Sequence, residues 1–156
     1  MPEIRAEQRI TPFLMFTHGG EAAVKHYVSV FKSSKIHSLS SNEGKLMHAS
    51  FELEGQRLLA MDGGEYFRFE QGFSLFVDCQ TQEEVDRLWD KLSDGGEKQQ
   101  CGWVKDRWGI SWQIVPSVLG KLMGDKDPVK AKRVVDAMLK MRKLVIKELQ
   151  EAYDRK

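Results

Sequence analysis

Three polar side chains with alternate spacing are the first candidates for chemistry in this sequence. His48, Ser50 and Glu52 lie in the segment LMHASFEL, so an extended strand there would place all three on one face. An imidazole can move a proton or hydrogen-bond a ligand near neutral pH. A solvated sheet face has the same pattern, and both interpretations of His48 stay open.

A lone glutamine in an apolar segment is the second candidate. In SWQIVP, strand alternation would place Gln113 on one face and both Trp112 and Ile114 on the other, packed beneath a helix. The same rule directs Ser74 and Phe76 of FSLFVD inward. Apolar walls with a few polar groups are typical of small-molecule sites.

Trp103 is the third candidate, with Cys101 and Lys105 as its neighbours on the same face of CGWVKD. Its indole could stack on a flat ligand, and structural packing is the alternative. The candidate ligand-binding residues are therefore His48, Ser50, Ser74, Trp103 and Gln113. We assign no catalytic residue.

Several kinds of chemistry lack the residues that they require. Cys79 and Cys101 belong to no C-x-x-C or Cys/His group, which argues against a zinc site or a disulfide framework and fits a reducing cytoplasm. No G-x-S-x-G is present, and we interpret Cys101 as a small half-buried strand thiol. The 13 glycines include no G-x-G, so a Rossmann-type S-adenosylmethionine site is not predicted.

The composition limits the partners. A net charge of +1 with 30% charged residues gives no general attraction to nucleic acid or membranes. The N-terminus MPEIRAEQRI lacks the layout of a signal peptide, and no apolar run is long enough to span a bilayer. The region 121–147 is basic, but it lacks interleaved aromatic residues, so we predict a solvated helix face and no nucleic-acid partner.

The elements that must position these residues occur twice in the same order. Apolar strands at 9–16 and 73–78 each precede an amphipathic helix, and further strands follow at 35–40, 46–53, 57–62, 101–106 and 111–116. Val85, Leu88 and Leu92 lie 61 positions after Val24, Tyr27 and Phe31. A single shift that relates strand and helix together predicts a duplication.

Local signals set the expected boundaries and faces. Thr81 and Glu84 form a capping box, a turn is expected at Glu54-Gly55 and at 106–109, and Asp127-Pro128 starts a helix. Alternation predicts that the concave face carries Thr11, Phe13, Met15, Leu58 and Ala60. It predicts that the helix-facing side carries Met47, Ala49, Phe51 and Leu53. The expected ranges in one domain are module one at 9–63, module two at 72–117 and a helical tail at 118–154.

The segments PFLMF, KLMHASFELEG and CGWVKDRWGISWQIVP resemble the vicinal oxygen chelate superfamily, which includes glyoxalases and bleomycin-resistance proteins. The similarity is greatest to the PhnB-like branch, often labelled 3-demethylubiquinone-9 3-methyltransferase. DPVKAKRVVDAMLKM resembles the C-terminal helices of that branch, which implies a break between two helices near Lys143; one continuous helix is the alternative.

The resemblance implies an α+β fold in which duplicated βαβββ modules form an incomplete barrel around a pocket, in a homodimer. Members with a metal place ligands at positions that correspond here to Thr11, Leu58, Gly72 and Gln113. Only Gln113 offers a suitable ligand oxygen, so we predict no intact metal site and no cofactor. A shifted alignment would make His48 the next candidate ligand.

We therefore predict a cytoplasmic protein that binds a small molecule and forms a homodimer, without a nucleic-acid or membrane partner. The alternative is a metal-dependent lyase, isomerase or dioxygenase of the same superfamily, with His48 and Gln113 among its ligands. The sequence leaves open whether the protein is an enzyme.

Overall fold

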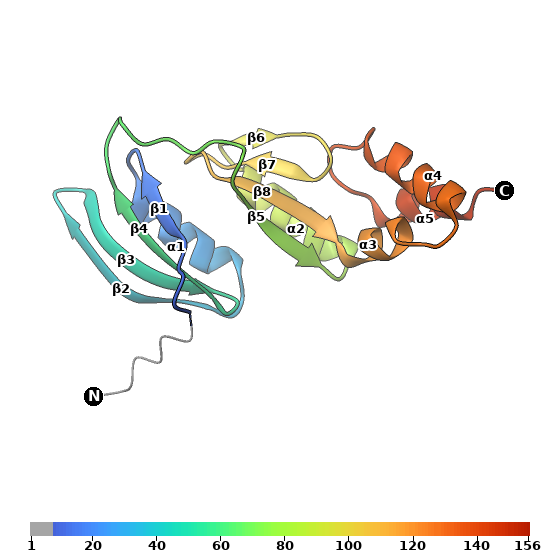
Figure 1. Cartoon of the computed structure of the whole chain (residues 1–156). Helices are drawn as coiled ribbons and strands as arrows, with labels where there is room; N and C mark the ends of the chain where they lie inside the picture. The colour runs from blue at the N-terminus through green and yellow to red at the C-terminus, as the bar shows by residue number, and fades with distance from the viewer. Residues whose placement is uncertain (1–7) are drawn as a thin grey trace. The chain divides into compact units, whose positions relative to one another are not determined.

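The computed structural model describes residues 8–156 and divides into two compact units, the first ending at Arg68 and the second beginning at Phe69 (Figure 1). Each unit holds one four-stranded sheet. Residues 1–7, in which we predict no targeting signal, lie outside the described residues. Across the described part of the chain, no helix combines the length and apolar character needed to cross a membrane.

The first unit consists of five elements in the order β-α-β-β-β. They are β1 (Phe13–Phe16), α1 (Gly20–Val30), β2 (Ser34–Asn42), β3 (Lys45–Leu53) and β4 (Gln56–Asp62). The sheet order is β1-β4-β3-β2, with β1 parallel to β4 and the other pairs antiparallel. The predicted Glu54-Gly55 turn has both φ angles positive, at 46° and 92°, as a two-residue hairpin requires.

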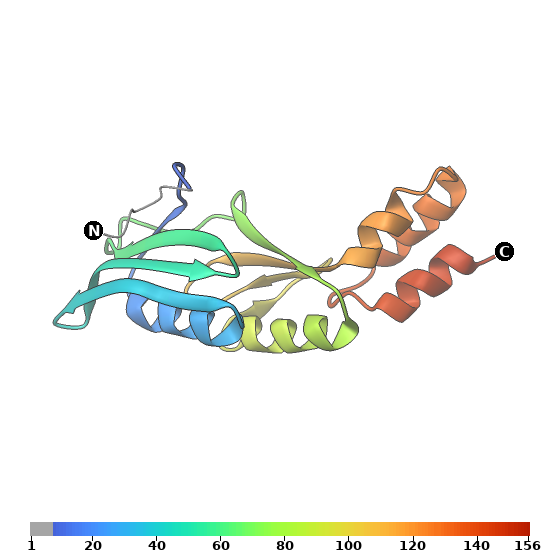
Figure 2. The same ribbon diagram turned by 90° about the horizontal axis from the view of Figure 1, so that it is seen from below.

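The core of the first unit lies between α1 and one face of this sheet (Figure 2). Val24 and Tyr27 of α1 are fully buried, as are Phe51 of β3 and Ala60 of β4. The other face of the sheet is open and carries Phe13, which is 47% exposed. Burying one face of the sheet against one helix is therefore what holds this unit together.

The second unit repeats this order and adds a helical tail. Its elements are β5 (Ser74–Cys79), α2 (Gln82–Ser93), β6 (Glu97–Lys98), β7 (Trp103–Lys105), β8 (Ser111–Pro116), α3 (Ser117–Met123), α4 (Pro128–Met138) and α5 (Ile146–Asp154). The sheet order is β5-β8-β7-β6, with β5 parallel to β8. This order matches that of the first unit strand for strand, so the predicted α+β fold of duplicated βαβββ modules is confirmed.

The shift of 61 positions relates β1 to β5, whereas β4 and β8, their partner strands, are related by a shift of 52. Phe16 pairs with Asp62 in the first unit, and Val77 pairs with Ile114 in the second. Strand β6, which the sequence analysis did not assign, has only two residues, both charged and exposed. So short a strand carries no alternation from which it could be predicted.

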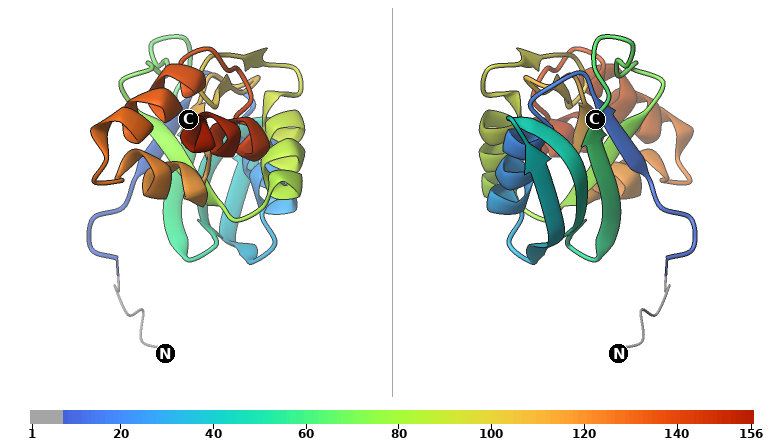
Figure 3. Two further views of the ribbon diagram at one scale, coloured as in Figure 1. Left: turned by 90° about the vertical axis from the view of Figure 1, so that its right-hand side faces the viewer. Right: turned by 90° about the vertical axis from the view of Figure 1, so that its left-hand side faces the viewer.

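The tail has a core of its own within the second unit. Helices α3, α4 and α5 lie together at the C-terminal end of the chain (Figure 3). From these helices and the α4–α5 linker, a cluster of buried residues packs together: Leu119, Leu122, Val134, Met141, Leu144 and Leu149. Helix α4 starts as predicted, because the Asp127 carboxylate accepts hydrogen bonds from the Val129 and Lys130 amides and Pro128 follows it. Lys143 lies between α4 and α5, so the predicted break is confirmed.

Two predictions of strand orientation in the first unit were wrong. Leu58 and Ala60 face α1 and are buried, and Leu59 and Met61 face the open side; the prediction failed because the apolar residues LLAM are compatible with either face. Met47 is 44% exposed, and Leu46 takes the buried position. A register shift between Ser40 and Ser41 in the β2–β3 pairing changes the alternation at this point.

Candidate functional site

The open face of the second sheet, which we define as the face opposite α2, carries a row of three side chains. Phe76 of β5 pairs with Gln113 of β8, and Gln113 pairs with Trp103 of β7. Directly paired residues share a face, so an amide lies between two aromatic rings. Phe76 is 60% exposed, whereas Trp103 and Gln113 are half-buried.

The row has its orientation because Trp112 and Ile114, on either side of Gln113, are buried on the other face. The Trp112 indole donates a hydrogen bond of 2.9 Å from Nε1 to the buried Asp106 carboxylate. The same carboxylate accepts hydrogen bonds from the backbone amides of Trp108 and Ile110. Asp106, predicted only as a turn residue, therefore stabilises the β7–β8 turn. By holding Trp112 on the buried face, it also directs the neighbouring Gln113 to the open face.

The Gln113 side chain has one partner on the open face. Its Nε2 donates to Ser74 Oγ at 2.9 Å from the neighbouring strand β5. This bond directs the amide and leaves Oε1 without a hydrogen bond to any residue in 8–156. A carbonyl oxygen fixed between two aromatic rings can accept a hydrogen bond from a flat ligand.

The structure brings together three of the five candidate residues. Ser74, Trp103 and Gln113 lie on the open face of the second sheet. His48 and Ser50 lie in the first unit on β3, on the face away from α1, as predicted for that strand. There His48 is exposed, and its Nε2 lies 3.3 Å from Ser38 Oγ on β2.

The residues around Gln113 do not fit a metal centre. Its cross-strand neighbours are Phe76 and Trp103, which carry no metal ligand. Leu58, the position expected to correspond to a ligand in the first unit, is apolar and buried against α1. Within residues 8–156, no group of three or more His, Cys, Asp or Glu side chains could hold a metal ion.

The turn between β1 and α1 does not fit a cofactor either. In Rossmann-type sites a glycine at this place lets the backbone approach the cofactor. Here the Gly20 amide donates to Asp62 Oδ1 at 2.8 Å, and a Cβ at Gly20 would lie 2.7 Å from that oxygen. Glycine at this position therefore allows the Asp62 carboxylate to approach the start of α1.

Comparison with known families gives a match over most of the chain. The sequence matches the family model described as 3-demethylubiquinone-9 3-methyltransferase over residues 8–115. This range covers more than half of the 156 residues and ends within β8. Because α3, α4 and α5 lie outside it, the resemblance of the tail to the helices of the PhnB-like branch stays a prediction.

The chain is similar to several solved structures, two of them with a TM-score above 0.5. The chain is 34% identical to a PhnB protein from Bacillus cereus, covering 70% of this chain and 99% of that chain with a TM-score of 0.66. Protein PA1353 from Pseudomonas aeruginosa is 23% identical, with coverages of 69% and 96% and a TM-score of 0.56. A glyoxalase/bleomycin resistance protein from Albidiferax ferrireducens T118 is 14% identical, with coverages of 67% and 95% and a TM-score of 0.46. A search of the curated proteins returned no match.

Proposed function

The chain belongs to the family of 3-demethylubiquinone-9 3-methyltransferase-like (PhnB) proteins, and we propose that it binds a small molecule on the open face of its second sheet. The row of Phe76, Gln113 and Trp103 carries this proposal. Phe76, which is 60% exposed, offers apolar surface beside the fixed amide of Gln113, and small-molecule sites combine such apolar surface with a few polar groups. Methyl transfer is not part of the proposal, because Asp62 fills the space at the start of α1.

The row defines the ligand that it would accept. Phe76 and Trp103 offer apolar surface to a flat or aromatic ligand. Gln113 Oε1 offers an acceptor, so the ligand would carry a hydroxyl or N–H group at its centre. The assignment of His48 and Ser50 to the same ligand stays a prediction.

A pair of matched probes tests this proposal. 2-Naphthol carries one hydroxyl donor, whereas 2-methoxynaphthalene has the same ring system without the donor. We expect 2-naphthol to bind the wild-type chain more tightly and to shift the Trp103 indole N–H resonance in NMR spectra. Gln113→Leu should lower the affinity for 2-naphthol about tenfold and remove the preference between the probes, because the acceptor is lost.

Two variants serve as controls for this experiment. Phe76→Ala should weaken both probes, because it removes apolar surface without changing the acceptor. Gln56→Leu changes an exposed amide on β4 that donates to the Arg57 carbonyl, and it should bind both probes as the wild type does. Equal affinity of the two probes for the wild type, or an unchanged preference in Gln113→Leu, would sink the proposal.

We also propose that the chain forms a homodimer. Two exposed apolar side chains of the first unit, Phe13 and Met47, support an apolar surface that a second copy could cover. Light scattering after gel filtration should give twice the chain mass of 17.9 kDa. A monomer across the accessible concentration range would contradict this proposal.

The cysteines support the proposal of a cytoplasmic location. Neither Cys79, which is buried, nor Cys101 forms a disulfide in residues 8–156. Such thiols persist in a reducing compartment. Thiol titration of protein isolated from its own cells should find both reduced, and a stable disulfide there would contradict the proposal.

A further inference from the structure

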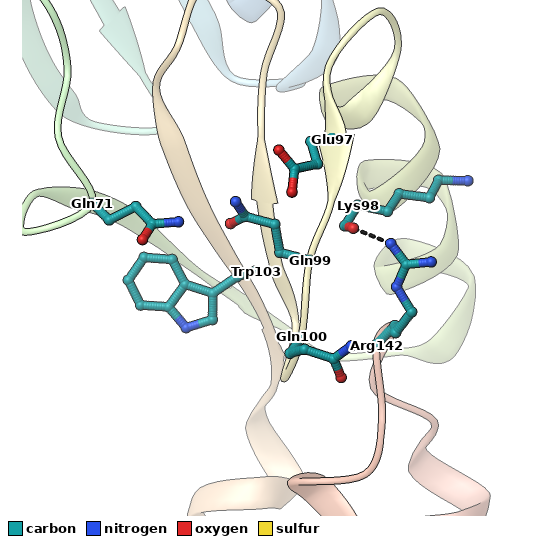
Figure 4. A pocket seen from close by; sticks show the side chains of 7 residues that line it. All are labelled: Gln71, Glu97, Lys98, Gln99, Gln100, Trp103 and Arg142. Carbon is teal, nitrogen blue, oxygen red and sulfur yellow. Dashed lines mark hydrogen bonds between the residues drawn. The ribbon is translucent and has the colours of Figure 1, made fainter.

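A groove of about 600 Å³ at the β6 edge of the second sheet is lined by more polar groups than the open face (Figure 4). Its lining includes the amides of Gln71, Gln99 and Gln100, the Glu97 carboxylate and the Trp103 indole. Figure 4 shows Gln71 and Gln99 extending from different segments toward the space beside the Trp103 ring. The groove and the row on the open face share only Trp103.

The polar groups of the groove are available to a ligand. Within residues 8–156, the side chains of Gln71, Gln99 and Gln100 form no hydrogen bond, and the Trp103 indole nitrogen donates to no residue. Each amide offers both donors and an acceptor, whereas the Glu97 carboxylate only accepts. Because Gln99 is half-buried, its amide has restricted access to water and gains from a ligand partner.

The tail supplies one wall of the groove. Arg142 lies in the linker between α4 and α5, and its guanidinium Nη2 donates to the Lys98 carbonyl of β6. Backbone hydrogen bonds from the Cys101 and Gly102 amides to the Met141 and Arg142 carbonyls hold the linker against the loop before β7. The other guanidinium N–H groups can face a ligand, and they lie outside the range that the family model matches.

These groups favour one ligand chemistry. A hydroxyl both donates and accepts, so it can pair with Glu97, with Arg142 or with any of the three amides. A sugar ring carries several hydroxyls at its edge and an apolar C–H face that can pack on an indole. A flat heterocycle would present fewer polar groups and would gain most from a second aromatic surface, which the groove lining does not provide.

We propose that this groove binds a saccharide, with Trp103 as the platform for the ring and Arg142 as a specificity-determining residue contributed by the tail. The proposal goes beyond ligand binding on the open face, and the two sites can be tested separately. Gln113 belongs only to the open face, whereas Gln99 and Arg142 belong only to the groove.

The experiment is an NMR titration of the full-length chain with the methyl glycosides of glucose, galactose, mannose and N-acetylglucosamine. The chain has four tryptophans, and Trp103→Phe identifies the indole resonance of interest. We expect at least one glycoside to shift the Trp103 resonance saturably and to leave those of Trp89 and Trp112, which are buried, unchanged. Arg142→Gln and Gln99→Leu should each lower the affinity about tenfold, as expected for a lost polar contact.

The controls separate this proposal from the previous one. Lys140→Gln changes an exposed residue of the same linker that does not line the groove, and it should leave glycoside affinity unchanged. If no glycoside shifts the Trp103 resonance while 2-naphthol does, the saccharide proposal fails and the proposed function stands. A larger response to adenosine than to any glycoside would also overturn the saccharide proposal in favour of a heterocycle.

Discussion

The two units start their helices in different ways, although their sheets have the same strand order. Helix α1 has Gly19 at its N-cap, without a side-chain hydrogen bond, and the Gly20 amide is satisfied by Asp62, 42 residues away on β4. Helix α2 is capped locally, because Thr81 Oγ1 accepts from the Glu84 amide and Glu84 accepts from the Gln80 amide. The position that corresponds to Asp62 in the second unit is Ile114, whose side chain cannot accept a hydrogen bond.

The comparison teaches that a repeated topology does not require repeated polar contacts. Each unit has a buried carboxylate, but Asp62 joins a helix start to its sheet, whereas Asp106 holds a hairpin turn and an indole. Strands β6 and β7 have two and three residues, against nine each in β2 and β3. The Asp106 contacts and the backbone bonds to the tail therefore replace ladder bonds that short strands cannot form.

The largest effect is expected for Asp106→Ala. The change leaves the amides of Trp108 and Ile110 and the indole of Trp112 without their acceptor, and the latter two residues are buried. We expect a loss of about 4 kcal/mol in the free energy of unfolding, because each such group costs about 1–3 kcal/mol. Urea unfolding followed by tryptophan fluorescence measures it, since all four tryptophans lie in the second unit. A loss of less than about 1 kcal/mol, the value for one ordinary hydrogen bond, would contradict this role for Asp106.

A pair of variants tests the two ways of starting a helix. Asp62→Ala leaves the Gly20 and Leu46 amides buried without an acceptor, so we expect a loss of about 3 kcal/mol in stability. Thr81→Ala removes a local cap on an exposed helix end and should cost about 1 kcal/mol. Urea unfolding followed by far-UV circular dichroism compares them. Equal losses would show that Asp62 is no more than an ordinary cap.

Two glycines with positive φ provide the next comparison. Gly102, at φ 82°, has no room for a Cβ, which would lie 2.7 Å from the Ile114 carbonyl oxygen and 3.0 Å from Leu144. Gly55, at φ 92°, has open space around it. We expect Gly55→Ala to cost about 1 kcal/mol from backbone strain alone, and Gly102→Ala about 2 kcal/mol more from the clash. Thermal unfolding of both variants measures the difference in stability loss. Equal losses would mean that the linker between α4 and α5 can move away from a Cβ at position 102 without cost.

Sequence signals predicted the features that depend on nearby residues. The Thr81 cap, the Asp127-Pro128 helix start and the Glu54-Gly55 turn each involve residues within four positions of one another, and all are present. The facing of Gln113 was also predictable, because buried residues on both sides of it leave one choice of register. The duplication was predictable too, because the apolar stripe on each helix is a pattern of residues close together in the sequence.

Contacts between distant segments could not be predicted from the sequence. Asp62 is the last residue of β4, and no local pattern shows that its carboxylate accepts hydrogen bonds from Gly20 and Leu46 on the face that also buries Leu58 and Ala60. Arg142 lies 39 positions after Trp103, and no local pattern brings both to one groove. The row on the open face was predicted in part, whereas the groove required the packing of the tail.

The smallest effect is expected for the polar contact between α2 and the tail, which has no counterpart in the first unit. The Gln82 amide and then the Lys143 ammonium group hydrogen-bond the Asp86 carboxylate, and they lower its pKa below the ordinary value. A lowered pKa in the folded state means that this stabilisation is present at neutral pH and is lost as the pH falls below about 4, the ordinary aspartate value. Because the side chains of Lys143 and Asp86 are 36% and 45% exposed, solvent screens the pair and the loss should stay below about 1 kcal/mol.

Hydrogen exchange at the Ile146 amide, which donates to Gln82 Oε1 at 2.7 Å, reports the contact between α2 and the tail directly. In the wild type, protection of this amide should fall as the pH drops through the lowered pKa of Asp86. In Asp86→Asn, protection should be lower at neutral pH and should lose this extra pH dependence. Asp136→Asn removes a carboxylate that pairs with Lys132 within α4, so it should keep the wild-type profile. If Asp86→Asn and Asp136→Asn give the same profile, the tail is held to α2 by its apolar core and backbone contacts, and the ion pair contributes nothing to its position.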